Sequence, residues 1–569
     1  MKRYPTRAVT AVVAAALCVG LLLSACSSGP EKKKAGGASS DALHLSACLV
    51  GRPETLDPIR KNNAAGQTVL ANVYENLMRV APGSSGKTRV IYGAAKSYKK
   101  KSNYDGTVTY TFLLRDSRWT DGKDVTAENF AYAWKRLADP ATKSPYAALL
   151  SNVVGYRAVQ NGGSLSKLKI ETKGKSVLAV TLTGECPWFL SDVCTAAATV
   201  PLRRDILKKL KKEAGKAEKE GRKIRDGWCF APDRLITNGP YRIASYTAES
   251  GATLKTNPCY TGTFSGPGTI CLTFADTAEK GWALYSAGKT DFISQLPEKQ
   301  TAVLAKRRGW EPQAELSVGV LLFNTRKAPF SNPQVCQAFA KAVNRTALSE
   351  EVGAAAAPAA GLIPYGVPET SKKSFRAVGG DLMDCNPENY EAECRDARDL
   401  LEKAGYDAGS FPSMKLVCTQ ATESTAKTLA KMLGKALDAD FRVNCVSEKK
   451  AASALKKGQY TMAVTEVTAL VNDAEGFLAP WNSKNGGNAA GYKNSAYDTL
   501  LTVIGSASDE QARRGCLHDA ESLLLEDCPL TPLYFNGTSW KLREKLTGLS
   551  RDSRGWFIFD QMAETAAGG

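Results

Sequence analysis

The sequence is poor in histidine: His44 and His518 are the only two in 569 residues. It also contains no CxxC pair, no HExxH motif and no GxSxG motif. Zinc sites draw mainly on closely spaced cysteines and histidines. Hydrolases need a nucleophile or a metal-bound water that such motifs activate. We therefore expect neither enzymatic activity, nor a bound metal, nor a cofactor.

Long apolar runs are also scarce, and the one that occurs lies at residues 8–23, behind Lys2, Arg3 and Arg7. A basic start followed by a short apolar run is typical of an export signal. The run falls short of the roughly 20 apolar residues that a spanning helix needs. The sequence thus predicts that residues 1–25 direct export and are removed.

The residues at the end of this run are Leu23-Ser24-Ala25-Cys26, which resemble the lipobox of bacterial lipoproteins. That resemblance implies acylation of Cys26 and attachment to the extracytoplasmic face of a bacterial cell membrane. Residues 26–39 are rich in Ser, Gly and Lys, a composition typical of a flexible tether. The alternative is a plain signal peptide with an incidental cysteine.

Basic residues outnumber acidic ones, and the formal net charge is +18. Part of the excess lies in residues 208–223, which form a solvated helix or insertion without an apolar stripe in our interpretation. Such a segment keeps a surface soluble, or attracts it to anionic lipid or wall polymer. No basic motif interleaved with aromatics occurs, so we expect no nucleic-acid partner.

Fifteen cysteines are many for a chain of this length. Exported proteins usually pair their cysteines, and the odd number left after Cys18 and Cys26 requires at least one free thiol. Cys516 and Cys528 are not expected to pair, because a helix between them would separate them by roughly 18 Å. The candidate pairs flank a turn, close a short loop or end two neighbouring strands: Cys259–Cys271, Cys385–Cys394 and Cys418–Cys445.

Hydrophobic periodicity alternates between strand and helix, which predicts a mixed α/β protein of two or three domains. No repeat of 20 to 50 residues is evident. The expected elements are a strand at 107–112, a helix beginning after Thr126 with Phe130, Trp134 and Leu137 on its buried face, a helix beginning at Asn332-Pro333, a helix at 396–404 and a βαβ unit at 414–419, 425–437 and 441–446.

Eight further blocks of the sequence stand out, at residues 53–58, 73–77, 110–140, 237–243, 284–292, 323–345, 397–406 and 491–501. In their content and order they resemble the extracellular solute-binding proteins of peptide ABC importers (family 5). The resemblance implies a two-lobed periplasmic-binding-protein-like fold (type II) that closes by a hinge, with an additional small α/β domain. It implies lobe I at 40–59, 176–317 and 536–569, the extra domain at 60–175, and lobe II at 318–535.

The same resemblance implies a lipid-anchored receptor that captures peptides and delivers them to ABC permease subunits, and we expect it to be a monomer. Other solutes stay open: modified peptides, opine-like compounds, oligosaccharides or a metal chelate. A surface sensor or adhesin of the same fold is a further alternative.

Peptide binders of this family pair the ligand with a strand of lobe II, which corresponds to residues 460–467. Where oligopeptide binders then carry an aspartate for the ligand's ammonium group, this sequence has Leu470. Val467 and Glu448 replace aromatic residues of the family. The candidate ligand-binding residues are Tyr146, Glu466, Val467, Thr468 and Asp473, with Glu466 and Asp473 as possible substitutes for the missing acid.

Overall fold

The computed structural model of the chain describes residues 43–83, 88–221, 235–308, 310, 312–370, 372–407, 409, 411–507 and 509–565. The predicted export signal, Cys26 and the tether at 26–39 lie outside these residues, as does the end of the basic segment at 222–223. Within the described residues, no helix combines the length and apolar character needed to cross a membrane.

One six-stranded sheet, sheet A, gathers strands from three distant parts of the chain. Its order is β18-β11-β1-β10-β9-β8. β1 runs parallel to β10 and β11, whereas β8, β9 and β10 form an antiparallel meander. The bounds are β1 His44–Val50, β8 Tyr241–Thr247, β9 Gly251–Thr256, β10 Thr269–Ala275, β11 Phe292–Ile293 and β18 Lys541–Leu542.

A four-stranded antiparallel sheet, in the order β4-β5-β7-β6, lies between β1 and β8 in the sequence. β5 alternates buried residues with more exposed ones, as predicted for the strand near residue 107. Helix α2 packs on β6 and β7, and its predicted face is fully buried: Phe130, Trp134 and Leu137. The strands are β4 Ala95–Ser102, β5 Val108–Leu114, β6 Ile170–Lys173 and β7 Val177–Leu182, and the helix is α2 Ala127–Ala138.

A second six-stranded sheet, sheet E, has the order β13-β17-β12-β16-β14-β15. The predicted βαβ unit is confirmed, because β14 and β15 run parallel and α11 packs on both. The bounds are β12 Gln313–Phe323, β13 Ala357–Pro358, β14 Met414–Cys418, β15 Phe441–Cys445, β16 Met462–Thr468, β17 Leu530–Thr538 and α11 Glu423–Leu437.

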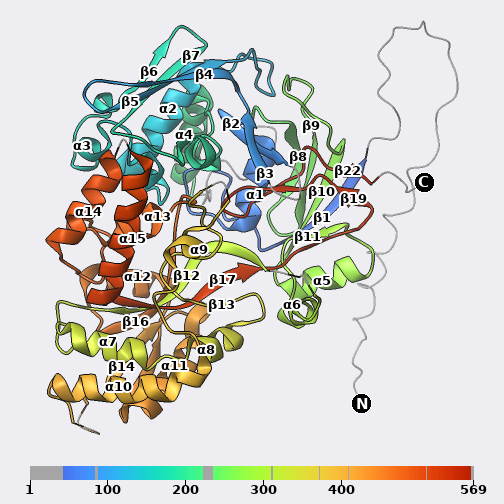
Figure 1. Ribbon diagram of the computed structural model, residues 1–569. Helices are drawn as coiled ribbons and strands as arrows, with labels where there is room; N and C mark the ends of the chain where they lie inside the picture. Colours follow the sequence, from blue (N-terminus) through green and yellow to red (C-terminus); the bar gives the residue numbers. More distant parts are fainter. Residues whose placement is uncertain are drawn as a thin grey trace, which may run out of the picture. The chain divides into compact units, whose positions relative to one another are not determined.

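Both faces of sheet E are covered by helices (Figure 1). Alternate residues of β12 and β16 enter two separate hydrophobic clusters, with Leu321 and Met462 in one and Leu322 and Ala463 in the other. The first cluster includes residues of α7 Pro333–Lys341, α8 Arg345–Val352, α10 Tyr390–Lys403 and α11, and the second residues of α13 Glu475–Leu478, α14 Ser495–Ser506 and α15 Glu510–Asp527.

The chain passes from sheet A to sheet E through β12 and returns through β17. These two strands pair antiparallel, and β17 leads within a few residues to β18 of sheet A. Such a pair of connections is suited to a hinge.

The other described elements are β2 Met78–Pro82, β3 Thr88–Tyr92, β19 Leu546–Thr547, β20 Ser550–Arg551, β21 Phe557–Ile558, β22 Ala563–Glu564, α1 Ala64–Val73, α3 Tyr156–Gln160, α4 Arg204–Lys219, α5 Ala278–Ser286, α6 Glu298–Ala305, α9 Phe375–Gly379, α12 Glu448–Lys457 and several short 3-10 or π turns.

One helix prediction needs correction. α10 begins at Tyr390 instead of near 396, because Tyr390, Cys394, Ala397 and Leu401 continue one apolar stripe toward its N-terminus. The basic segment is helical up to Lys219, one of the two predicted alternatives, and the short apolar stripe of α4 begins before the segment, with only one of its three residues inside 208–223. In α4, Leu210 is buried, and Ile206 and Leu207 pack against the same hydrophobic cluster.

The three predicted disulfides are not confirmed, since all six thiols are free. Strand register places Cys271 opposite Thr253, six residues from Cys259. Cys394 is buried on α10, while the Cys385 thiol points to the carbonyl of Met383. Cys418 and Cys445 lie, as expected, on neighbouring strands and in direct register, but no disulfide joins them. Burial and the adjacent Cys445 thiol raise the pKa of Cys418 to about 12.

The start of helix α7 was predicted from a capping asparagine followed by proline, and the contribution of this cap to stability can be measured. The Asn332 side chain accepts a hydrogen bond from the backbone N–H of Gln334 at 3.0 Å, and Pro333 occupies the first helical position. Replacing Asn332 by alanine is expected to lower the free energy of unfolding by about 1 kcal/mol. Urea unfolding would measure this. Gln334→Ala, an exposed change that keeps the capped N–H, should have little effect, and equal losses in both variants would contradict the capping role.

Candidate functional site

The C-terminal half of β16 has one unpaired edge. On one side, β16 pairs with β12 over its whole length, from Met462 to Thr468. On the other side, β14 reaches only Met462 and Ala463. Among the described residues, no strand continues this pairing along Thr465–Thr468. An unpaired edge of this kind offers backbone N–H and C=O groups to an added extended chain.

Three of the predicted ligand residues lie on this edge. Glu466 and Thr468 are exposed, and Val467 is half-buried on the opposite face, where it packs against the second cluster of sheet E. The structure links Glu466 and Thr468 through two residues, Asn536 and Ser317, that were not predicted from the sequence. Asn536 Nδ2 donates to Glu466 Oε1 and to Ser317 Oγ, and Thr468 Oγ1 donates to Ser317 Oγ at 3.3 Å.

Tyr146 belongs to a different contact network. Its hydroxyl accepts hydrogen bonds from Gln67 Nε2 at 2.8 Å and from the backbone N–H of Asn62 at 3.3 Å. The neighbouring Lys61 forms a 3.0 Å ion pair with Glu448, at the first residue of α12. Among the described residues, no hydrogen bond joins Tyr146 to the edge of β16. Its role as a lining residue stays a prediction.

Asp473 lies beyond the edge, and its carboxylate is engaged by Arg513 of α15. The two carboxylate oxygens accept from Arg513 Nη2 at 2.7 Å and Nη1 at 3.2 Å. Arg513 Nη2 also donates to Glu475 Oε2 at 3.0 Å. Burial raises the pKa of Glu475, although Arg513 opposes that shift. The buried guanidinium of Arg513 thus pairs with the carboxylates of both Asp473 and Glu475. This arrangement stabilises the fold and leaves Asp473 little freedom to bind a ligand.

Residues 470–472, which connect β16 to this ion pair, contact the part of the chain that surrounds sheet A. Val471 is buried in the hydrophobic cluster of sheet A and the four-stranded sheet, and Leu470 packs against the same cluster. The backbone N–H of Asn472 donates to Asp192 Oδ1 at 2.9 Å. Leu470, which the sequence resemblance sets where oligopeptide binders are expected to carry an aspartate, therefore takes part in apolar packing.

Asp192 was not predicted from the sequence. It lies in the π turn η5 Phe189–Val193 and is 1% exposed. Oδ1 also accepts from Ser553 Oγ at 2.6 Å, and Oδ2 accepts from Ser191 Oγ at 2.6 Å. Burial raises the pKa of Asp192, although Arg554 and these hydrogen bonds oppose that shift. No local pattern could reveal this site, because both donors to Oδ1 are distant in sequence, 280 and 361 residues away.

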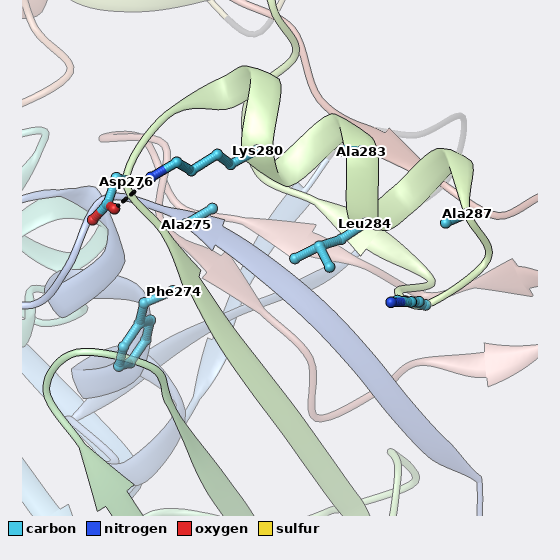
Figure 2. Close-up of a pocket in the computed structure, with 8 residues that line it drawn as sticks. Phe274, Ala275, Asp276, Lys280, Ala283, Leu284 and Ala287 are labelled. Carbon is cyan, nitrogen blue, oxygen red and sulfur yellow. Dashed lines mark hydrogen bonds and ion pairs between the residues drawn. The ribbon is translucent and has the colours of Figure 1, made fainter. Parts of the chain in front are cut away.

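A hollow of about 390 Å³ lies elsewhere, between the end of β10 and helix α5 (Figure 2). The ion pair between Lys280 and Asp276 stands at one end of it, and Leu284 and Phe274 supply apolar surface. None of the predicted ligand residues lines it. In the part of the chain that the structure describes, no group of three or more His, Cys, Asp or Glu side chains is placed to hold a metal ion.

Three known proteins illustrate what this chain is similar to. The dipeptide-binding protein DppE of Bacillus subtilis is 26% identical over 95% of this chain and 96% of its own length. The probable deoxycholate-binding periplasmic protein YgiS of Escherichia coli is 27% identical over 85% of this chain and 86% of its own. The solved complex of Haemophilus influenzae OppA with RPPGFSPFR covers 92% of this chain and 99% of its own at a TM-score of 0.73 and 23% identity.

These fold relatives confirm the predicted architecture, the two-lobed type II fold with an additional small α/β domain. The model of the bacterial extracellular solute-binding proteins, family 5 Middle, matches residues 89–489. That range includes the open edge of β16 and all five predicted ligand residues. The chain belongs to the bacterial extracellular solute-binding proteins of family 5.

Proposed function

We propose that this protein is the ligand-capturing component of an ABC importer and that its ligands are peptides. The observation that carries the proposal is the unpaired edge of β16 at Thr465–Thr468, in a chain of a solute-binding family. Strand addition to such an edge uses backbone groups that every peptide possesses, so it tolerates many sequences. DppE and OppA, by their names, bind dipeptides and oligopeptides.

The proposal includes attachment to the membrane through acylated Cys26 and delivery of the ligand to permease subunits. The domain bounds inferred from the sequence are part of it: lobe I at 40–59, 176–317 and 536–569, the extra domain at 60–175, and lobe II at 318–535. Closure through β12 and β17 would bring lobe I residues over the edge of β16. Ligand affinity then depends on how strongly the ligand favours the closed state. Binding without catalysis is the expected activity.

A second candidate is a non-peptide solute of moderate size. Leu470 and Val467 are uncharged and partly buried, and the relative YgiS is named a probable deoxycholate-binding protein. An amphipathic, anionic ligand has no ammonium group, so it would not need a carboxylate partner in the protein. It would not need a free strand edge either, because it has no peptide backbone.

Ligand-dependent thermal stabilisation separates the two candidates. A mixture of two- to five-residue peptides at about 100 times its dissociation constant is expected to stabilise the folded state by about 2.7 kcal/mol, which raises the unfolding temperature. Deoxycholate under the same conditions should have no effect. Stabilisation by deoxycholate and by no peptide would reject the peptide proposal in favour of the second candidate. Lysozyme in the same peptide mixture controls for non-specific effects.

A further inference from the structure

Two free thiols lie side by side at the edge of sheet E. Cys418 ends β14 and Cys445 ends β15, and the two residues are direct partners in this parallel pair of strands. Neighbouring strands lie about 4.8 Å apart, and the side chains of paired residues leave the sheet on the same face. A disulfide can join two residues whose Cα atoms are about 4.4–6.8 Å apart. The strand pairing therefore already holds the two cysteines at a separation that a disulfide can bridge.

The two thiols differ in their access to solvent. Cys418 is 1% exposed and packs in the hydrophobic cluster that includes residues of α11. Cys445 is exposed, and β15 is the outermost strand of its sheet. The two side chains are nevertheless within hydrogen-bonding reach of each other. A small reagent can thus reach the Cys445 sulfur without opening the core, while the Cys418 sulfur waits directly behind it.

Helix α11 places a carboxylate and an ammonium group beside these thiols. Glu423 and Lys427, in the first turns of the helix, form an ion pair at 2.7 Å. The hydrogen bond from Lys427 lowers the pKa of Glu423, and a weaker hydrogen bond from the Cys445 thiol adds to this shift. Glu423 and, less strongly, the two thiols raise the pKa of Lys427. A nearby cation favours the thiolate, which is the reactive form of cysteine.

We propose that Cys418 and Cys445 form a reversible redox site, which a small-molecule disulfide converts to an intramolecular disulfide and a small-molecule thiol restores. The Cys445 thiolate attacks one sulfur of the small disulfide, and one small thiolate leaves. The Cys418 thiol then loses its proton and attacks Cys445 Sγ, which releases the second small thiolate. The two protein sulfurs are oxidised, and the small disulfide is reduced to two thiols. The inference does not depend on the proposed function, because it needs no bound ligand.

The new bond would tie the end of an edge strand to the body of sheet E. The backbone N–H of Val446 already donates to the carbonyl of Cys418 at 2.9 Å, and Ser447 directly precedes α12. The bond would also close the segment that contains α11 into a covalent loop. Such a loop restricts the unfolded chain and thereby stabilises the folded state. We therefore expect the oxidised protein to resist unfolding better than the reduced one.

Peptide mass spectrometry without reductant tests the inference on the purified protein. The reduced protein is equilibrated with oxidised glutathione, and the remaining thiols are then blocked by alkylation. Trypsin, which cleaves after lysine and arginine, leaves the two cysteines on separate peptides, 416–427 and 443–449. These peptides are expected to appear as one disulfide-linked species in most molecules. They should separate again when the native protein is returned to excess reduced glutathione before alkylation.

Oxidation is also expected to raise the unfolding temperature of the wild type by about 5 °C. Cys445→Ser should show neither the linked peptides nor this rise. Cys271→Ser is the matched control, because Cys271 is likewise exposed on a strand but has Ser46 and Thr253 as its direct partners. It should keep both the link and the rise in unfolding temperature.

Three results would overturn the inference. Cys445 could carry only a glutathione adduct, which would mean that Cys418 does not displace it. Cys445 could be linked to another cysteine instead. A link between peptides 416–427 and 443–449 that survives excess reduced glutathione in the native protein would show a permanent cross-link and no reversible site. All three are read from the wild type, so the decision does not depend on the folding of any variant.

Discussion

Replacing Arg513 by methionine is expected to lower the free energy of unfolding by about 3–5 kcal/mol at neutral pH, the usual loss when one partner of a buried ion pair is removed. Arg513 is 2% exposed and is the shared partner of Asp473 and Glu475. Methionine keeps much of the side-chain volume but leaves two carboxylates close together without their cation. Urea unfolding at pH 7.5 would measure the loss.

The loss should depend on pH in a defined direction. Burial already raises the pKa of Glu475 in the native protein, and removing Arg513 takes away the main group that opposes that effect, leaving only the hydrogen bond from Trp188. The folded variant then binds protons more readily than the unfolded chain, so its stability rises as pH falls from about 7.5 toward the ordinary carboxyl range. The destabilisation should therefore be smaller at pH 5.5 than at pH 7.5.

Arg442→Met provides the control, because Arg442 pairs with Asp440 on the surface, where both side chains are more than half exposed. Little change in stability is expected there. An Arg513→Met variant as stable as the Arg442→Met variant, or one whose loss grows at lower pH, would contradict the role assigned to Arg513.

Replacing Asp192 by alanine is expected to weaken peptide binding about 5- to 150-fold, the range that corresponds to 1–3 kcal/mol. The Asp192 carboxylate accepts from the backbone of Asn472, which follows the open edge of β16. If the proposed lobes separate on opening, this hydrogen bond exists only in the closed state. Its loss leaves the Asn472 N–H without that acceptor and favours the open state, which lowers affinity without touching the ligand.

Ser553→Ala is the matched control for Asp192→Ala. It removes another donor to the same oxygen, Ser553 Oγ at 2.6 Å, and leaves Asn472 in place. Its dissociation constant should stay near that of the wild type even if its stability falls. Calorimetric titration with the peptide mixture would measure both variants. Unchanged affinity in Asp192→Ala, with folding verified, would mean that the contact between Asn472 and Asp192 does not distinguish open from closed states.

Elements controlled by short-range patterns could be predicted from the sequence. The buried face of α2 follows from apolar residues at helical spacing, and the start of α7 follows from a capping asparagine before proline. The parallel pairing of β14 with β15 follows from the βαβ pattern. The disulfide predictions failed where they relied on spacing alone, because spacing says nothing about the register that sets Cys271 opposite Thr253.

The sequence alone indicates the family, the mixed α/β architecture and export. Each of these depends on patterns that can be seen along the chain: the order of the motifs, the hydrophobic periodicity and the N-terminal signal. The sequence also shows that Leu470 carries no charge. Only the tertiary structure shows that Asp473 forms an ion pair with Arg513 and that Asn536 donates a hydrogen bond to Glu466. It also shows that Asp192 accepts a hydrogen bond from the backbone N–H of Asn472. These contacts join residues 40 to 280 positions apart. Strand register, bulges and the packing of distant segments create them, and local sequence patterns do not encode these features.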